Sequence, residues 1–89
     1  MTARERAAIE VLITQHLAKA AHSRAMARAW LEAVRRSARG GWDEEYTWAC
    51  SLNARTDRVV SREHMIAVRL LRARLASGSP RAPRIRKVA

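Results

Sequence analysis

The chain has 89 residues and a formal net charge of +10, from 18 Lys and Arg against 8 Asp and Glu. A chain of this length forms one domain at most, and its single cysteine, Cys50, excludes an intrachain disulfide. It contains no run of the roughly 18 apolar residues that a membrane span needs, and its first residues lack the apolar core of a signal peptide. We therefore expect a cytoplasmic protein without membrane contact, and the abundance of Arg and Ala suggests a bacterial or phage origin.

Residues 1–39 contain neither Gly nor Pro and predict a helix. Thr2 and Glu5 have the spacing of a capping box, in which each side chain satisfies a free backbone amide at a helix start. Apolar side chains then recur at helical spacing within about 100° of arc. The members of this stripe are Ile9, Leu12, Ile13, His16, Ala20, Ala27, Trp30, Leu31 and Val34.

Two structures can produce this stripe. One is a single helix of about 36 residues, which is long for a compact monomer and favours a homodimer through the stripe from Ile9 to Val34. The other is an antiparallel hairpin broken at His22, with Ser23 capping the second helix. The missing turn residues favour the uninterrupted helix.

The glycine pair 40–41 predicts the end of this helix, with Gly40 in the left-handed conformation. The acidic run 43–45 then predicts the start of a second helix, because carboxylates stabilise a helix N-terminus. These acids need no metal or catalytic role to explain them.

The second helix is expected over about 43–54, and residues 40–53 hold three of the four aromatic residues of the chain. Trp42 and Tyr46 share one face of it, and Trp48 lies about 100° round from that face. We expect Tyr46 and one tryptophan to pack against the first helix. The other tryptophan is a candidate anchor for a protein partner.

Residues 54–60 predict a connection, because Thr56 and Asp57 are turn formers. Ser61 is then expected to cap a third helix that ends near Ala76. This helix has two apolar strips separated by arginines. The first strip comprises His64, Ala67, Val68, Leu71 and Leu75, and the second comprises Ile66 and Leu70.

The predicted fold is all-α, with a long N-terminal helix and two shorter helices in a single domain over residues 1–76. Residues 77–89 contain Gly78, Pro80 and Pro83 without periodicity, and predict a flexible basic tail. Residues 58–76 and 77–89 each carry a net charge of +4. An anionic partner is therefore expected to bind the last third of the chain.

No catalytic arrangement stands out. Neighbouring carboxylates of the acidic run diverge on a helix, and no histidine has the spacing of a metal ligand. We expect a protein without enzymatic activity, metal or cofactor.

The leading hypothesis is a small regulatory or accessory protein that binds nucleic acid, because arginine matches phosphate geometry. The predicted nucleic-acid-binding residues are Arg62, Arg69, Arg72, Arg74, Arg81, Arg84, Arg86 and Lys87. The alternative is a phage- or plasmid-type module that binds and inhibits an acidic host protein. Its predicted contact residues are Trp42, Tyr46 and Trp48.

Overall fold

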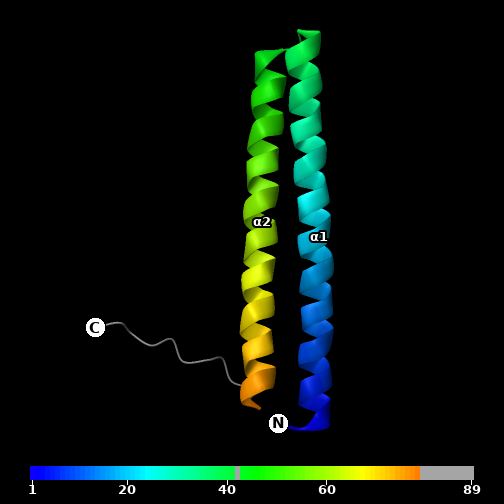
Figure 1. The fold of residues 1–89 in the computed structure, drawn as a ribbon, viewed down its shortest axis with the longest axis vertical. Helices are drawn as coiled ribbons and strands as arrows, with labels where there is room; N and C mark the ends of the chain where they lie inside the picture. The colour runs from blue at the N-terminus through cyan, green and yellow to red at the C-terminus, as the bar shows by residue number, and fades with distance from the viewer. Residues whose placement is uncertain (42, 79–89) are drawn as a thin grey trace, which may run out of the picture.

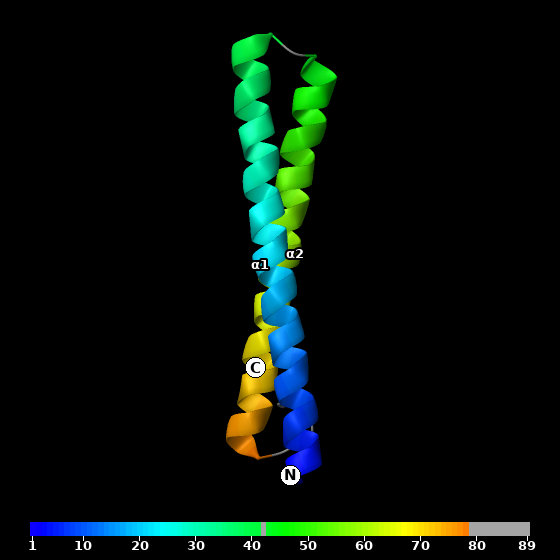
Figure 2. The same cartoon turned by 90° about the vertical axis from the view of Figure 1, so that its right-hand side faces the viewer.

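The computed structural model describes residues 1–41 and 43–78, which form two long helices. Helix α1 spans Ala3–Gly40, and helix α2 spans Glu44–Ser77. The helices run antiparallel, side by side, in a hairpin that extends 58 Å along its longest axis (Figures 1 and 2). The all-helical prediction is confirmed for these ranges, whereas the prediction of three helices is wrong. The basic tail predicted for residues 77–89 falls almost entirely outside the described residues.

The start of α1 has the predicted capping box. The backbone amide of Glu5 donates to Thr2 Oγ1 at 3.1 Å, and the amide of Thr2 donates to Glu5 Oε2 at 3.4 Å. These bonds satisfy two amides that have no partner within the helix.

The turn between the helices is built by Gly41 and Asp43. Gly41 takes the left-handed conformation, with φ of 67°, and its amide donates to the Ser37 carbonyl. The left-handed residue is thus one position later than the predicted Gly40. The Asp43 side chain caps α2 by accepting from the Glu45 amide at 3.0 Å, as expected for an acidic helix start.

Helix α1 is uninterrupted, which decides between the two structures that the stripe allowed. His22 lies within the helix, and Ser23 is buried, with 6% of its surface exposed, instead of capping a new helix. Helix α2 runs beside α1 along the whole hairpin (Figure 1) and covers most of the stripe, whereas Leu12 stays 42% exposed. The stripe that the sequence offered for a homodimer is therefore occupied within the chain itself.

Helix α2 is also continuous, so the connection predicted over residues 54–60 does not exist. Thr56 stays within the helix and donates its hydroxyl to the Leu52 carbonyl at 3.0 Å, four residues earlier. Ser61 is a buried mid-helix residue and not an N-cap. With neither Gly nor Pro between Glu44 and Ser77, packing against α1 outweighs the weak turn preference of Thr56 and Asp57.

Buried and half-buried residues recur along both helices at alternating intervals of three and four. This period of 3.5 is that of a left-handed coiled coil. We call these residues the seam. In α1 they are Ile9, Ile13, His16, Ala20, Ser23, Ala27, Trp30, Val34 and Ser37, and in α2 they are Thr47, Cys50, Ala54, Asp57, Ser61, His64, Val68, Leu71 and Leu75.

The seam changes character along the hairpin. Near the chain ends it is an apolar cluster of Ile9, Ile13, Val68 and Leu71, flanked by Leu17 and Leu75. In the middle it is built from small residues, and the Ser61 hydroxyl donates to the Ala20 carbonyl at 3.1 Å. A side chain this short reaches the backbone of α1 only because the helices approach closely. At the turn, the hydroxyls of Ser37 and Thr47 bond to each other.

Neither α1 nor α2 contains a stretch that is both long enough and apolar enough to cross a lipid bilayer.

Candidate nucleic-acid interface

The position of an exposed residue relative to the seam determines on which face of the hairpin it lies. In an antiparallel pair, a twofold axis perpendicular to the plane of the helices relates α1 to α2. Residues that directly follow seam residues therefore lie on one face of the hairpin, and residues that directly precede them lie on the opposite face. Eight arginines follow seam residues, and we call their surface the arginine face. They are Arg24, Arg28 and Arg35 of α1 and Arg55, Arg58, Arg62, Arg69 and Arg72 of α2.

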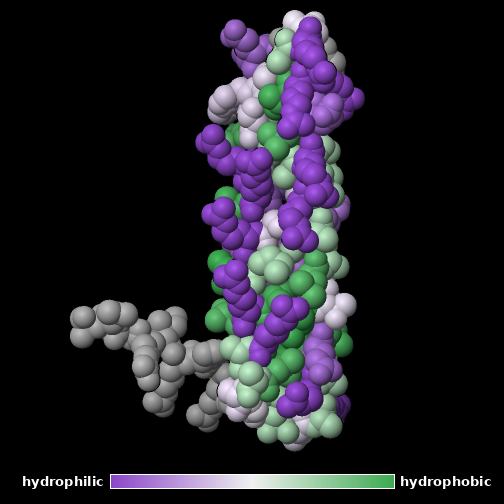
Figure 3. Space-filling model, viewed as in Figure 1, coloured by the Kyte–Doolittle hydropathy of each residue, from purple (hydrophilic) through white to green (hydrophobic). Residues whose placement is uncertain are grey.

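All eight side chains of the arginine face are exposed. The view in Figure 3 is of this face, and hydrophilic side chains cover much of both helices on it. Within residues 1–41 and 43–78, only Arg35 of the eight forms an ion pair, with Glu32 at 3.5 Å. Glu10 also follows a seam residue, and Glu44 lies at the turn. The arginine face thus carries a large excess of positive charge.

The opposite face differs in charge and in polarity. Its charged residues that precede seam positions are Lys19, Arg36, Glu63 and Arg74. Most of the other positions there hold Ala or a larger apolar residue, including Leu12, Met26, Val60 and Leu70. The positive charge of the hairpin is therefore concentrated on one side, which composition alone does not reveal.

The predicted nucleic-acid-binding residues are divided between the faces. Arg62, Arg69 and Arg72 lie on the arginine face. Arg74 lies on the opposite face, is half-buried, and has no hydrogen-bond partner for its Nε among the described residues. The remaining four predicted residues, Arg81, Arg84, Arg86 and Lys87, are outside the described residues.

The sequence-based prediction lacks five members of the arginine face, because it assigns anion binding to the last third of the chain alone. Arg24, Arg28 and Arg35 come from α1, and Arg55 and Arg58 come from the segment that was predicted to be a connection. Their signal is present in the sequence, since each follows a residue of the 3.5-residue repeat. For Arg55 and Arg58, the repeat can be recognised only when residues 54–60 are treated as helix.

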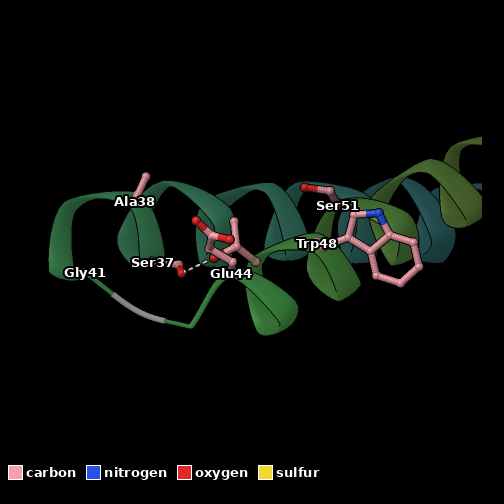
Figure 4. Close-up of a pocket in the computed structure, with 7 residues that line it drawn as sticks. Ser37, Ala38, Gly41, Glu44, Trp48 and Ser51 are labelled. Atoms are coloured by element: carbon pink, nitrogen blue, oxygen red, sulfur yellow. Dashed lines mark hydrogen bonds between the residues drawn. The ribbon is translucent and has the colours of Figure 1, made fainter.

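A shallow cleft lies at the turn end of the arginine face (Figure 4). Trp48 forms part of its wall and is 68% exposed. The other lining residues are Ser37, Ala38, Gly41, Glu44, Thr47 and Ser51. The cleft thus combines an exposed indole with hydroxyl groups and one carboxylate.

Tyr46 and Trp48 lie on different sides of the hairpin, because Tyr46 precedes the seam residue Thr47 and Trp48 follows it. Tyr46 is 44% exposed and does not belong to the buried core between the helices. A hydrogen bond with the Cys50 side chain raises the pKa of the Tyr46 hydroxyl, and nearby Arg36 opposes this shift. Trp42, the third predicted contact residue, is outside the described residues.

The described ranges hold no group of three or more His, Cys, Asp or Glu side chains that could bind a metal ion. The histidines that come together are His16 and His64, with their Nδ1 atoms 2.8 Å apart. Two imidazoles bonded to each other fill one layer of the seam.

The chain matches no protein-family model, no curated protein and no solved structure. A function for this protein therefore has to rest on the geometry of its own residues.

Proposed function

We propose that this protein is a non-enzymatic accessory or regulatory protein that binds nucleic acid through its arginine face. The observation that carries the proposal is the gathering of eight exposed arginines on one side of the hairpin, of which only one is in an ion pair within the described ranges. Guanidinium groups that lie on the same face without carboxylate partners repel one another, and binding of a polyanion reduces that repulsion.

The side-chain chemistry favours phosphate as the group that is bound. The planar guanidinium of arginine can donate two parallel hydrogen bonds to a phosphate, whereas the ammonium of lysine acts as a point charge. Arg55, Arg62 and Arg69 repeat every seven residues, which corresponds to about 10.5 Å along the helix axis. A straight row of cations on a rigid helix suits contacts to a sugar-phosphate backbone, which carry no sequence information.

The basic residues beyond α2 extend the same proposal. Arg81, Arg84, Arg86 and Lys87 follow the end of α2 and add +4 to the charge of the chain. We expect these cations to form a second contact with the anionic ligand, as basic arms beside helical domains do.

The test is fluorescence anisotropy with labelled duplex DNA, duplex RNA and single-stranded RNA of arbitrary sequence, titrated over a range of salt concentrations. Backbone binding predicts that log affinity falls linearly with log salt concentration, with a slope of about −0.9 for each phosphate neutralised on B-DNA. Removing the residues after Ser77 should reduce this slope without abolishing it. Absence of binding to all three ligands at low salt would exclude the proposal.

A second candidate function is favoured by Trp48, whose 68% exposure is unusual for the largest apolar side chain. Under this alternative, the protein inhibits or redirects an acidic host protein that inserts a side chain beside Trp48 in the cleft. The test is capture of a partner from a nuclease-treated lysate of the source cell, with Trp48→Ala as the variant. Loss of the captured protein with unchanged far-UV circular dichroism supports the alternative, and capture that survives the substitution rules out Trp48 as the anchor.

A further inference from the structure

Helix α2 has a second apolar surface, which lies outside both the seam and the arginine face. Five of its large side chains are between 44% and 49% exposed: Tyr46, Leu52, Val59, Ile66 and Leu70. Leu52, Val59 and Ile66 repeat every seven residues, and on a helical projection they lie on the side of α2 opposite the seam. We call the surface formed by these five residues and the small residues between them the outer face of α2.

A helix with apolar residues on two sides is expected to be covered on both. The described hairpin is a single layer of two helices (Figure 2), so α1 covers only the seam side of α2. Stable domains bury apolar surface between at least two layers. The outer face is thus the part of the hairpin that most requires a partner.

We propose that the partner is a second copy of this chain, with the two α2 helices packed antiparallel through their outer faces. A pairing centred between Val59 and Val60 places these two residues of the two copies opposite each other. Thr56 then lies opposite Glu63, and toward both ends of α2 large side chains lie opposite smaller ones. The pairs between the two copies are Tyr46 with Ala73, Ala49 with Leu70, Leu52 with Ala67, and Asn53 with Ile66. Such twofold self-complementarity is the property of an interface that the same surface forms with itself.

The charges at the two ends of this pairing are also complementary. The same alignment places Glu45 of one copy opposite Arg74 of the other. Neither side chain is in an ion pair within residues 1–41 and 43–78. The two residues are 29 positions apart on one helix, or about 43 Å, so they cannot meet within a single chain.

The pairing leaves the arginine face free. Arg55, Arg62 and Arg69 follow seam residues and border the outer face instead of lying within it. Pairing through the arginine faces would bring together surfaces of the same strong charge, which opposes association. A dimer through the outer faces therefore has four helices and exposes both arginine faces.

The first test is sedimentation equilibrium of the full chain and of two matched variants. We expect a mass of about twice the 10.1 kDa of the monomer. Val59→Glu places a carboxylate at the centre of the pairing and should weaken the dimer at least tenfold. Val11→Glu is the control, because Val11 is 55% exposed and lies on α1, and it should leave the dissociation constant unchanged. Far-UV circular dichroism should give the same helical signal for both variants.

The second test is a charge exchange between the ends of α2. Glu45→Arg alone should weaken the dimer through repulsion from Arg74, and adding Arg74→Glu should restore it. Glu44→Arg is the matched control for loss of an acid from the first turn of α2, because Glu44 lies on the side of the arginine face and not opposite Arg74. Restoration in the double variant supports the antiparallel twofold pairing.

Three results would overturn the proposal. The first is a chain that sediments as a 10.1 kDa monomer at about 100 µM, which would leave the outer face to a different protein. The second is equal weakening by Val59→Glu and Val11→Glu. The third is a double charge exchange that is no better than Glu45→Arg alone.

Discussion

His16 of α1 and His64 of α2 face each other across the hairpin, with their Nδ1 atoms 2.8 Å apart and their ring centroids 5.1 Å apart. The bond requires that one Nδ1 carry a hydrogen and that the other accept it. Both rings are half-buried and lie in the seam beside the apolar cluster that contains Ile13 and Val68. The pair is thus a polar layer next to the largest apolar cluster in the hairpin.

Replacing one histidine of this pair should cost more than replacing both. His64→Leu leaves His16 half-buried without its hydrogen bond, and we expect it to lower the free energy of unfolding by about 1 to 2 kcal/mol. His16→Leu with His64→Leu removes both polar groups and extends the apolar cluster, so its stability should equal or exceed that of the natural chain. Urea denaturation followed by circular dichroism measures all the variants, and additive losses in the double variant would show that the rings are not coupled.

The close approach of the helices depends on Ser61, which is 6% exposed and donates to the Ala20 carbonyl. Ser61→Ala removes one hydrogen bond but keeps the helix separation, and should cost about 1 kcal/mol. Ser61→Leu adds volume where the helices nearly touch, and should cost about 1 to 3 kcal/mol. Thermal denaturation distinguishes the two variants. A leucine that stabilises the hairpin more than alanine would mean that the helices are not closely packed here.

Gly41 permits the turn between α1 and α2 because its φ is 67°. Apart from Gly41 and its chain neighbours, no atom of the described residues lies within 4 Å of the position that a Cβ would occupy, so the expected cost of a substitution is one of backbone conformation. Gly41→Ala should therefore lower the free energy of unfolding by about 1 kcal/mol, and Gly41→Asn should cost less, because asparagine tolerates the left-handed region. The control is Ala38→Gly in the last turns of α1, which should destabilise the helix only through its lower helix propensity. Equal stability of the alanine variant and the natural chain would contradict the left-handed turn.

The sequence predicts the N-terminal half of this fold well. The capping box at Thr2, the continuous stripe and the acidic helix start at Asp43 are local signals, and the structure contains each of them. The single helix over residues 1–39 follows from the absence of Gly and Pro. Helix propensity and capping act over a few residues, so they can be recognised without knowledge of the tertiary packing.

The predicted connection over residues 54–60 is wrong because contacts with α1, and not the local sequence, keep this segment helical. Thr56 and Asp57 have weak helix preferences, and no local feature shows that Ala54, Asp57 and Ser61 belong to the same repeat as Val68 and Leu71. That repeat is decided by contact with α1, which overrides the local preference. Because the helix was divided there, the arginines of α1 and α2 were not recognised as neighbours on one face.

The central claim is that position on the arginine face, and not net charge alone, determines nucleic-acid binding. The most direct measurement compares two triple variants in the salt-dependent anisotropy experiment with B-DNA. One is Arg55→Gln, Arg62→Gln and Arg69→Gln, and the other is Arg4→Gln, Lys19→Gln and Arg36→Gln, three exposed cations off that face. We expect the first to reduce the magnitude of the salt slope by about 2.7 and the second to leave it nearly unchanged. Equal reductions in the two variants would contradict the claim, because they would show that the charge of the chain acts without regard to its position.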